Sequence, residues 1–301
     1  MNFLYCFDNN FNLQALNSIN SIINYSKNEN LNFYIIHDSP KTFSKILDRY
    51  LPNYKHLIKI YKFDFDSIKF PRINRAHVTK ATYFRLFFQK YLPKNIEFIT
   101  YVDSDIICLS NPENRIQELI DTIDNNNLLI GAVSEDSLVD QNINRLGMKS
   151  QKYFNAGVMV INLKQWIKKI EINEIISCME NLRDKIKWWD QDVLNVLVDG
   201  NYLELKNDFN MKVSDTRGTP DKSVVFLHYA GKGKPWDNSF FEDPRTNIYQ
   251  SAFLRTGFSE YHIDPKGFNE NILFFKYLLS DKYKQFNKKK LLHSYIKNKL
   301  K

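Results

Sequence analysis

Short apolar runs alternate with segments of helical spacing along most of this chain, and this alternation restricts its possible folds more than any other feature. Ala15, Leu16, Ile19, Ile22 and Ile23 recur at helical spacing after the first apolar run. Strands are predicted at 2–7, 31–37, 57–63, 97–102, 128–134 and 224–229, and helices at 41–51, 77–91 and after Asn111-Pro112. Strands that alternate with helices predict an α/β fold with a mostly parallel sheet covered on both faces.

Length and cysteine content narrow the class of protein. A chain of 301 residues with 43% hydrophobic content can bury a large core, as one domain or as one domain with an appendage. Cys6, Cys108 and Cys178 form no CxxC pair, which disfavours a disulfide framework or a structural zinc site and favours a reducing compartment. No apolar run reaches the roughly 18 residues of a membrane span. The start, MNFLYCF, lacks a basic leader and predicts a strand rather than a signal peptide, so we expect a soluble, cytoplasmic protein.

The positive charge is concentrated at the C-terminal end. The net charge is +8, and the segment from Lys276 to Lys301 holds nine lysines against one acid, Asp281. The preceding residues are therefore neutral overall, whereas a nucleic-acid-binding protein usually carries its basic surface on the folded domain. This distribution predicts no nucleic-acid partner and a separate role for the C-terminal segment.

The same C-terminal segment combines its lysines with apolar residues. On a helix, one apolar stripe beside a basic face can be formed by Phe286, Leu291, Leu292, Tyr295, Ile296 and Leu300. This pattern predicts a basic amphipathic helix that lies on an anionic membrane surface. The alternative is a terminal helix that packs on the domain and leaves its lysines in water.

One predicted strand ends in two carboxylates. Asp103 and Asp105 follow the apolar run 98–102, and open α/β sheets bind their ligands beyond the carboxyl ends of the strands. Residues two apart in extended backbone point the same way, so both carboxylates can reach one hard cation such as Mg²⁺ or Mn²⁺. The chain has nine glycines and neither a GxGxxG nor a P-loop motif, so a dinucleotide fingerprint is missing.

The same Asp-x-Asp spacing occurs twice more. Asp64 and Asp66 follow a run with alternating apolar residues, typical of a half-exposed edge strand, and we expect their carboxylates to face water. Asp190 and Asp192 begin a predicted helix, where residues two apart do not share a face. Spacing alone is therefore weak evidence for a metal site, and the context favours the pair that follows the buried strand.

Five short motifs occur in an order that resembles glycosyltransferase family 8. They are FDNNF at 7–11, VDSD at 102–105, YFNAGVMVINLKQW at 153–166, WDQDVLN at 189–195 and HYAGKGKPW at 228–236. The resemblance covers roughly residues 1–240 and implies a Rossmann-like sheet of the GT-A type. It predicts a nucleotide-sugar-dependent glycosyltransferase domain at 1–240 and an extension at 241–301 that ends in a basic amphipathic helical tail.

The resemblance also implies roles for individual residues. The implied metal ligands, for Mn²⁺ or Mg²⁺, are Asp103, Asp105 and His228. The implied donor site contains Asp8 and Asn10 near the base and ribose, together with Arg85, Asp103, Ser104, Asn155, Ala156, Gly231 and Lys234. Glu135 corresponds to a position that binds the acceptor sugar, and Asp190 and Gln191 correspond to positions at the reacting carbon.

Elementary chemistry agrees with several of these roles and leaves alternatives open. An imidazole suits Mn²⁺ better than Ca²⁺ or Mg²⁺, two glycines let the backbone approach a phosphate, and Lys234 supplies a point charge for it. The alternatives are a buried structural His228, a helix-surface Arg85, a capping turn at Asn9 and a solvated Lys232. Phe11 stands where relatives often have tyrosine, which leaves base stacking possible without the hydroxyl group.

The resemblance implies a retaining, metal-dependent transfer of glucose or galactose from a UDP-sugar to a lipid-linked lipopolysaccharide or lipooligosaccharide core saccharide. The enzyme would act as a peripheral protein on the inner face of the cytoplasmic membrane. No nucleophile is evident, and a front-face exchange is favoured over a covalent intermediate.

Two other classes of protein stay open. A phosphatase of the haloacid dehalogenase type places its Asp-x-Asp pair after the first strand, which here ends in Asp8-Asn9-Asn10. The other class is a non-catalytic basic adaptor for a membrane or for nucleic acid.

Overall fold

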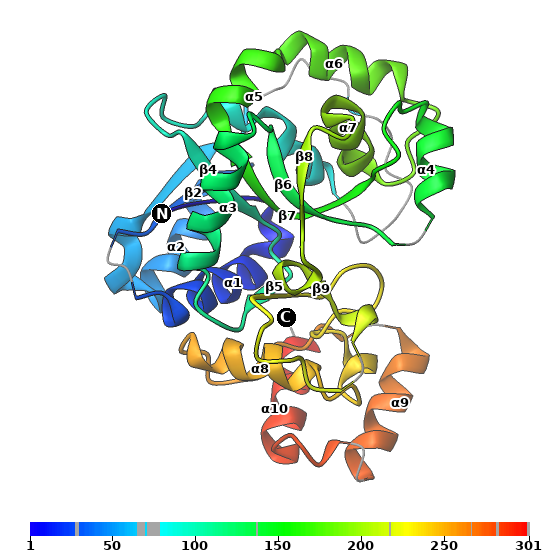
Figure 1. Ribbon diagram of the computed structural model, residues 1–301. Helices are drawn as coiled ribbons and strands as arrows, with labels where there is room; N and C mark the ends of the chain where they lie inside the picture. Colours follow the sequence, from blue (N-terminus) through cyan, green and yellow to red (C-terminus); the bar gives the residue numbers. More distant parts are fainter. Residues whose placement is uncertain are drawn as a thin grey trace.

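The computed structural model describes residues 1–301 except 28–29, 65–69, 71–78, 137, 217, 266, 281–282 and 300–301. At its centre lies a seven-stranded sheet in the order β3-β2-β1-β4-β7-β6-β8 (Figure 1). The strands are β1 (Asn2–Phe7), β2 (Asn32–His37), β3 (Ile58–Lys62), β4 (Phe98–Val102), β6 (Ile130–Ser134), β7 (Phe154–Asn162) and β8 (Tyr202–Leu205). All neighbours pair in parallel except β7, which is antiparallel to both β4 and β6. The predicted mostly parallel sheet is confirmed.

Strand β7 is absent from the sequence-based strand predictions, although it connects the two parallel halves of the sheet. All nine of its residues are buried, so it lacks the alternation that marks a half-exposed strand. Strand β8 and the three-residue strand β5 (Ile106–Cys108) are also absent from those predictions, because they are too short to show a period. The six predicted strands agree with the structure to within two residues at each end.

Helices cover both faces of the sheet, as predicted. One face packs on α1 (Asn12–Tyr25), α2 (Pro40–Tyr50) and α3 (Glu113–Asn125). The other packs on the 3₁₀ helix η3 (Lys80–Lys90), α4 (Val139–Leu146), α5 (Leu163–Lys169), α6 (Ile172–Asn181) and α7 (Trp189–Val198). Side chains of β1 alternate between the two layers, since Phe3 and Tyr5 face the first and Leu4 the second. The start of the predicted helix 77–91 lies outside the described residues, and the remainder is η3.

A second, three-stranded sheet lies at the carboxyl end of β4. It has the order β5-β10-β9, with β10 (Phe226–His228) antiparallel to β5 and parallel to β9 (Met211–Lys212). The register places His228 opposite Ile106. Strand β10 therefore ends beside the turn that connects β4 to β5. This pairing brings together motifs more than 120 residues apart.

The C-terminal helices are α8 (Thr246–Arg255), α9 (Phe268–Leu279) and α10 (Lys288–Lys299), at the bottom of Figure 1. Helix α8 is bonded to α1: the Asn17 side chain donates to the Tyr249 carbonyl at 3.3 Å, and that of Asn20 donates to Thr256 Oγ1 at 3.1 Å. The helices α9 and α10 share a separate apolar cluster, which contains Phe241, Tyr261, Ile263, Phe274, Leu278, Tyr283, Phe286, Leu291 and Tyr295. The division of the chain at residue 240 stays a prediction.

Helix α10 forms within the predicted tail, but its apolar residues do not form a free stripe. Phe286, Leu291 and Tyr295 are buried in the C-terminal cluster, so the alternative of a terminal helix packed on the protein describes α10. Ile296 alone among the predicted stripe residues is more than a third exposed in the described part, and Leu300 lies outside it. Across the described residues, we find no helix that combines the length and the apolar character needed to cross a bilayer.

Candidate active site

The carboxylates of Asp103 and Asp105 lie in the turn between β4 and β5, at the carboxyl edge of the central sheet. The amide of Asp103 donates to the Gly157 carbonyl of β7 at 2.8 Å, which fixes the turn to the neighbouring strand. Asp105 is buried, and Asp103 is partly exposed toward a cavity of about 590 Å³. The position agrees with the rule that α/β sheets bind ligands beyond their strand ends.

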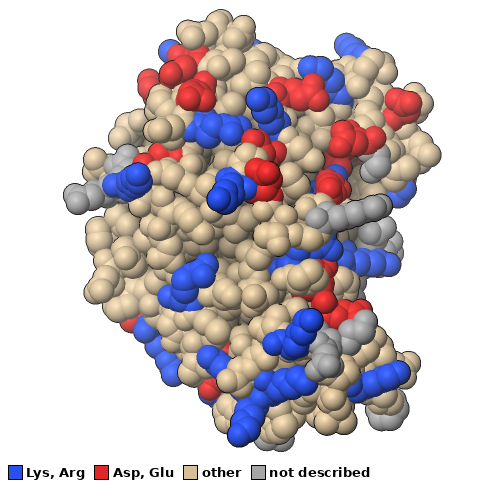
Figure 2. Space-filling view, turned by 60° about the horizontal axis from the view of Figure 1, so that its bottom comes forward, with Lys and Arg blue, Asp and Glu red and all other residues tan. Residues whose placement is uncertain are grey.

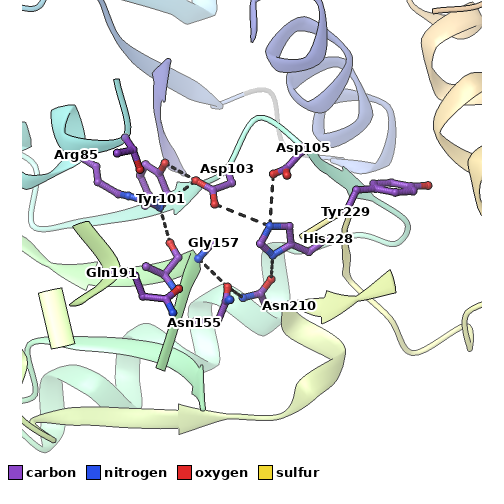
Figure 3. Close-up of polar contacts among 12 residues, drawn as sticks. Arg85, Tyr101, Asp103, Asp105, Asn155, Gly157, Gln191, Asn210, His228 and Tyr229 are labelled. Atoms are coloured by element: carbon purple, nitrogen blue, oxygen red, sulfur yellow. Dashed lines mark hydrogen bonds and ion pairs between the residues drawn. The ribbon is translucent and has the colours of Figure 1, made fainter. Parts of the chain in front are cut away.

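His228 completes a three-residue cluster with this pair. Its Nε2 lies 3.4 Å from Asp105 Oδ1 and 3.9 Å from Asp103 Oδ2 (Figure 3), and the three potential ligand atoms lie within 4.8 Å of one another. Two carboxylate oxygens and one imidazole nitrogen form a donor set that suits Mn²⁺ or Mg²⁺. His228 is buried and hydrogen-bonded, as its structural alternative predicted, but the free edge of its ring faces the carboxylates.

Asn210 orients the His228 ring and has no counterpart among the predicted site residues. Its side-chain oxygen lies 2.9 Å from His228 Nδ1, and its amide donates to Asn155 Oδ1 at 2.8 Å. The Asn155 oxygen also accepts from the Gly157 amide at 2.9 Å. Such a partner on the far nitrogen selects the tautomer that presents Nε2 to a metal ion. A single asparagine before a two-residue strand carries no sequence signal for this role.

Position 157 needs glycine because the His228 ring packs against it, and not because of its backbone conformation. A Cβ atom at this position would lie 2.4 Å from Cε1 and 2.7 Å from Nδ1 of His228. The space for the imidazole therefore exists only because β7 carries glycine here. The side chain that packs against this glycine is thus the histidine of the predicted metal site.

Arg85 connects the carboxylate turn to α7. Its guanidinium donates to Asp103 Oδ1 at 2.9 Å, to the Ala156 carbonyl at 2.8 Å and to Asp190 Oδ2. Burial alone would lower the pKa of Arg85, but Asp103 and Asp190 raise it well above its usual range. Tyr101 donates to the same Asp103 oxygen at 2.6 Å. Arg85 is buried, which rules out the alternative of a helix-surface arginine.

Asp190 and Gln191 begin α7 at the wall of the cavity. Asp190 accepts from Arg85 and from the Thr82 hydroxyl; burial raises the pKa of this carboxyl, and these two contacts oppose the rise. Gln191 accepts from the Ala156 amide at 3.0 Å. Asp192 points to a different partner, a bidentate Arg145 at 2.9 Å. The two carboxylates thus point to different partners, as expected for residues two apart on a helix.

Lys234 forms an ion pair with one of the two carboxylates, that of Asp105. Its ammonium donates to Asp105 Oδ2 at 2.6 Å and to the Tyr229 carbonyl at 2.7 Å. Burial alone would raise the pKa of Asp105, but Lys234 and His228 hold it well below its ordinary value. Within the same loop Gly233 has φ +87°, and a Cβ there would overlap the Phe240 ring. Gly231, with φ +78°, lines the cavity beside the exposed Lys232.

Glu135 also lines the cavity. It accepts from the Asn155 amide at 2.7 Å and pairs with Lys212 at 2.6 Å. Lys212 lies on β9, two residues after Asn210, and was not predicted as a site residue. Burial lowers the pKa of Lys212, and the contacts with Glu135 and Asp215 more than reverse this. The pair gives one wall of the cavity a polar, hydrogen-bonding surface.

The cavity brings together most of the predicted site residues. Among the residues that line it are Arg85, Asp103, Ser104, Asp105, Glu135, Asn155, Asp190, Gln191, His228, Gly231 and Lys234. Phe11, Trp188 and Trp189 add aromatic surface. Ala156 contributes its backbone carbonyl, which accepts from Arg85. Asp8 caps the 3₁₀ turn η1 (Asn9–Phe11), where Asn10 N donates to Asp8 Oδ1 at 3.0 Å.

The remaining acidic pair behaves as predicted where it can be followed. Asp64 is exposed after β3, which is an edge strand of the sheet. Asp66 lies outside the described residues. Among the described residues, Asp103, Asp105 and His228 are the only group of three side chains placed to hold one metal ion.

This fold and site define the class of GT-A glycosyltransferases. The crystal structure of the galactosyltransferase LgtC in complex with donor and acceptor sugar analogues matches with a TM-score of 0.71, over 88% of this chain and 98% of that one. At 21% identity this match establishes the fold. The chain belongs to glycosyl transferase family 8, whose family model matches residues 2–239, and the resemblance predicted from the motifs is confirmed.

Enzymes of lipopolysaccharide synthesis are among the similar proteins. A lipopolysaccharide 1,2-glucosyltransferase of Escherichia coli is 30% identical over 263 residues, which cover 80% of this chain and 76% of the relative. A lipopolysaccharide 1,3-galactosyltransferase of Salmonella typhimurium is 28% identical over 256 residues, which cover 78% of this chain and 72% of the relative. The two relatives transfer different sugars, so similarity at this level does not identify the sugar.

Proposed function

We propose that the protein is a retaining, metal-dependent hexosyltransferase that moves glucose or galactose from a UDP-sugar to a lipopolysaccharide or lipooligosaccharide core saccharide. The observation that carries the proposal is the cluster of Asp103, Asp105 and His228 with Lys234, open to a cavity of about 590 Å³. The acceptor class is drawn from the similar lipopolysaccharide transferases. Such an acceptor is anchored in lipid, so the enzyme would act on the inner face of the cytoplasmic membrane.

The cluster supports a diphosphate leaving group. A bound Mn²⁺ or Mg²⁺, held by Asp103, Asp105 and His228, would act as a Lewis acid toward the departing diphosphate. Lys234 can supply a second positive charge from the same side, since its ammonium already lies on Asp105. The open backbone at Gly231 leaves room for a phosphate beside that ammonium.

The contacts of Asp190 favour front-face transfer over a covalent intermediate. Its carboxylate is buried and accepts from both Arg85 and Thr82, so its oxygens are already engaged. A nucleophile would have to leave these partners in a buried site, which costs free energy. Asp190 is better suited to position Arg85, and Gln191 is better suited to fix the backbone at Ala156. The acceptor hydroxyl would then attack on the face that the diphosphate leaves.

A thermal shift experiment tests the nucleotide and the metal together. UDP with Mn²⁺ should raise the melting temperature, because a ligand that binds only the folded state stabilises it. His228→Ala and Lys234→Ala should each reduce this shift. A larger shift with GDP or CMP would contradict the assignment of the nucleotide.

Thermal shift and a phosphate-release assay together separate the two other classes of protein. A non-catalytic adaptor would show no shift with divalent metal and UDP-sugar. Phosphate release from a simple phosphomonoester, without consumption of a UDP-sugar, would indicate a phosphatase. The proposed transferase should show the shift and release no phosphate from such substrates.

A further inference from the structure

Helix α9 is apolar on two opposite faces, and the protein covers only one of them. Phe274 and Leu278 point into the C-terminal cluster and are at most 8% exposed. On the other side, Ile272, Phe275 and Leu279 are 51%, 39% and 88% exposed. These three positions follow the i, i+3, i+7 spacing of one helix face. A helix that is apolar all round is normally buried all round.

The exposed apolar side chains concentrate in this region. Of the ten large apolar side chains that are exposed in the described part of the chain, five belong to α9 or α10: Ile272, Leu273, Phe275, Leu279 and Ile296. Phe275 packs edge-on against Tyr295, the residue before Ile296, with ring centroids 5.1 Å apart. This contact links the outer face of α9 to the exposed position on α10. We call these five residues the α9 patch.

Exposed lysines lie on the same two helices as the α9 patch. Lys276 occupies the i+4 position of the same helix face, and Lys289, Lys297 and Lys299 are exposed on α10, where Lys297 also pairs with Glu260 at 2.8 Å. Figure 2 shows basic side chains distributed over this end of the molecule, at the bottom of the view, with uncharged surface between them. The whole excess charge of the sequence lies between Lys276 and Lys301. An apolar face with a basic rim is the pattern of a helix that lies in an anionic membrane surface.

We propose that the α9 patch is a docking surface for anionic lipid bilayers. The charge decides between a bilayer and a second copy of the chain, because self-association would bring the two basic rims together, whereas anionic headgroups complement them. The inference rests on the proposed function, which it deepens by naming the surface that holds the enzyme against the membrane of its acceptor. It differs from the tail predicted from sequence, whose apolar residues Phe286, Leu291 and Tyr295 are buried.

Two serine substitutions test the patch in the full-length protein. Ile272→Ser with Leu279→Ser removes apolar surface without changing the charge or a buried contact. The matched control is Ile167→Ser on α5, since Ile167 is 53% exposed and is followed by Lys168 and Lys169. Co-sedimentation is measured at low salt with phosphatidylcholine vesicles, with and without phosphatidylglycerol.

The wild-type protein and the Ile167→Ser control should sediment with the anionic vesicles and much less with neutral ones. The double variant should bind the anionic vesicles about tenfold more weakly or worse, given the apolar area it loses. Its melting temperature and its UDP-sugar hydrolysis should stay at the wild-type values.

Three results would overturn the inference: no binding by the wild type, equal binding by the double variant, or a wild-type dimer that the double variant breaks without any lipid binding. Hydrolysis serves as the independent measurement. Vesicle binding without UDP-sugar hydrolysis would contradict the proposed function and leave the docking surface standing.

Discussion

At the residue scale, the carboxylate turn is stabilised by two cations on opposite sides. Arg85 holds Asp103 and Lys234 holds Asp105, with hydrogen-bond distances of 2.9 and 2.6 Å. Two carboxylates that follow a buried strand would repel each other if they had no such partners. Lys234 holds Oδ2 of Asp105, whereas Oδ1 lies 3.4 Å from His228 Nε2. A metal ion bound at Oδ1 would share this carboxylate with the ammonium, and the two positive charges would oppose each other.

The first prediction follows from this competition. Lys234→Met should bind Mn²⁺ more tightly in the absence of nucleotide, by about tenfold, because a like charge no longer opposes the ion. It should bind UDP more weakly in the presence of Mn²⁺. Isothermal titration measures both affinities, and Lys222→Met is the control, since Lys222 is exposed and is not among the residues that line the cavity. Weaker Mn²⁺ binding by Lys234→Met would show that the lysine does not compete with the ion.

The second prediction concerns Asn210, which orients His228. Asn210→Ala should lower the Mn²⁺ affinity about 10- to 100-fold, as is typical when the partner of a metal-binding histidine is lost. The control is Asn207→Ala, three residues earlier at an exposed position. Manganese binding is followed by electron paramagnetic resonance. Equal affinities for the two variants would remove Asn210 from the site.

At the scale of secondary structure elements, strand pairing brings the site together. Strand β7 supplies Asn155 and Gly157 from the middle of the sheet, and the pairing of β10 with β5 delivers His228 to the carboxylates. The third prediction tests the fit between these elements. Gly157→Ala should displace the His228 ring, which a Cβ would approach to 2.4 Å, and should abolish metal binding while the fold persists.

Gly131→Ala on the neighbouring strand β6 is the control for this prediction. Its added Cβ would meet only the ends of two flexible side chains, Ile123 at 2.9 Å and Leu205 at 3.2 Å. Titration with Mn²⁺ compares the two alanine variants, and circular dichroism checks that both are folded. Normal metal affinity in Gly157→Ala would contradict the claimed packing of glycine against histidine.

These elements also show how much of the fold and of the site can be predicted from the sequence alone. Periodicity predicts strands such as β1 and β2, because their patterns are local. It misses β7, which is buried throughout, and it cannot show that β10 pairs with β5 in a second sheet, because pairing is not a local property. The third metal ligand came from the family resemblance rather than from spacing. Asn210 and Lys212 were missed because they lie in short segments without a period.

At the scale of the whole molecule, a basic segment from Lys276 to Lys301 follows residues that are neutral overall, and α8 is hydrogen-bonded to α1. The fourth prediction tests whether α10 is part of the fold. Leu291 is fully buried, so Leu291→Ala should lower the free energy of unfolding by about 2–5 kcal/mol. Ile296→Ala, 47% exposed on the same helix, should change it by no more than about 0.5 kcal/mol.

Denaturant unfolding followed by circular dichroism measures both variants. Similar, small effects would mean that α10 is loosely attached and that its apolar side chains are free to enter a membrane. A large effect at Leu291 alone would place them in the protein core, and the α9 patch would then be the apolar surface that a membrane can reach.

The proposed function requires that Asp103, Asp105 and His228 form the metal site of a UDP-sugar-dependent transferase. Donor hydrolysis with Mn²⁺ across a panel of UDP-sugars tests this claim, because donor breakdown requires no knowledge of the acceptor. The wild type and Asp64→Asn, at an exposed acid of the same spacing, should hydrolyse UDP-glucose or UDP-galactose. Asp105→Asn should remain folded and show no Mn²⁺-dependent hydrolysis. Equal losses in the two variants, or equal activity, would contradict the claim.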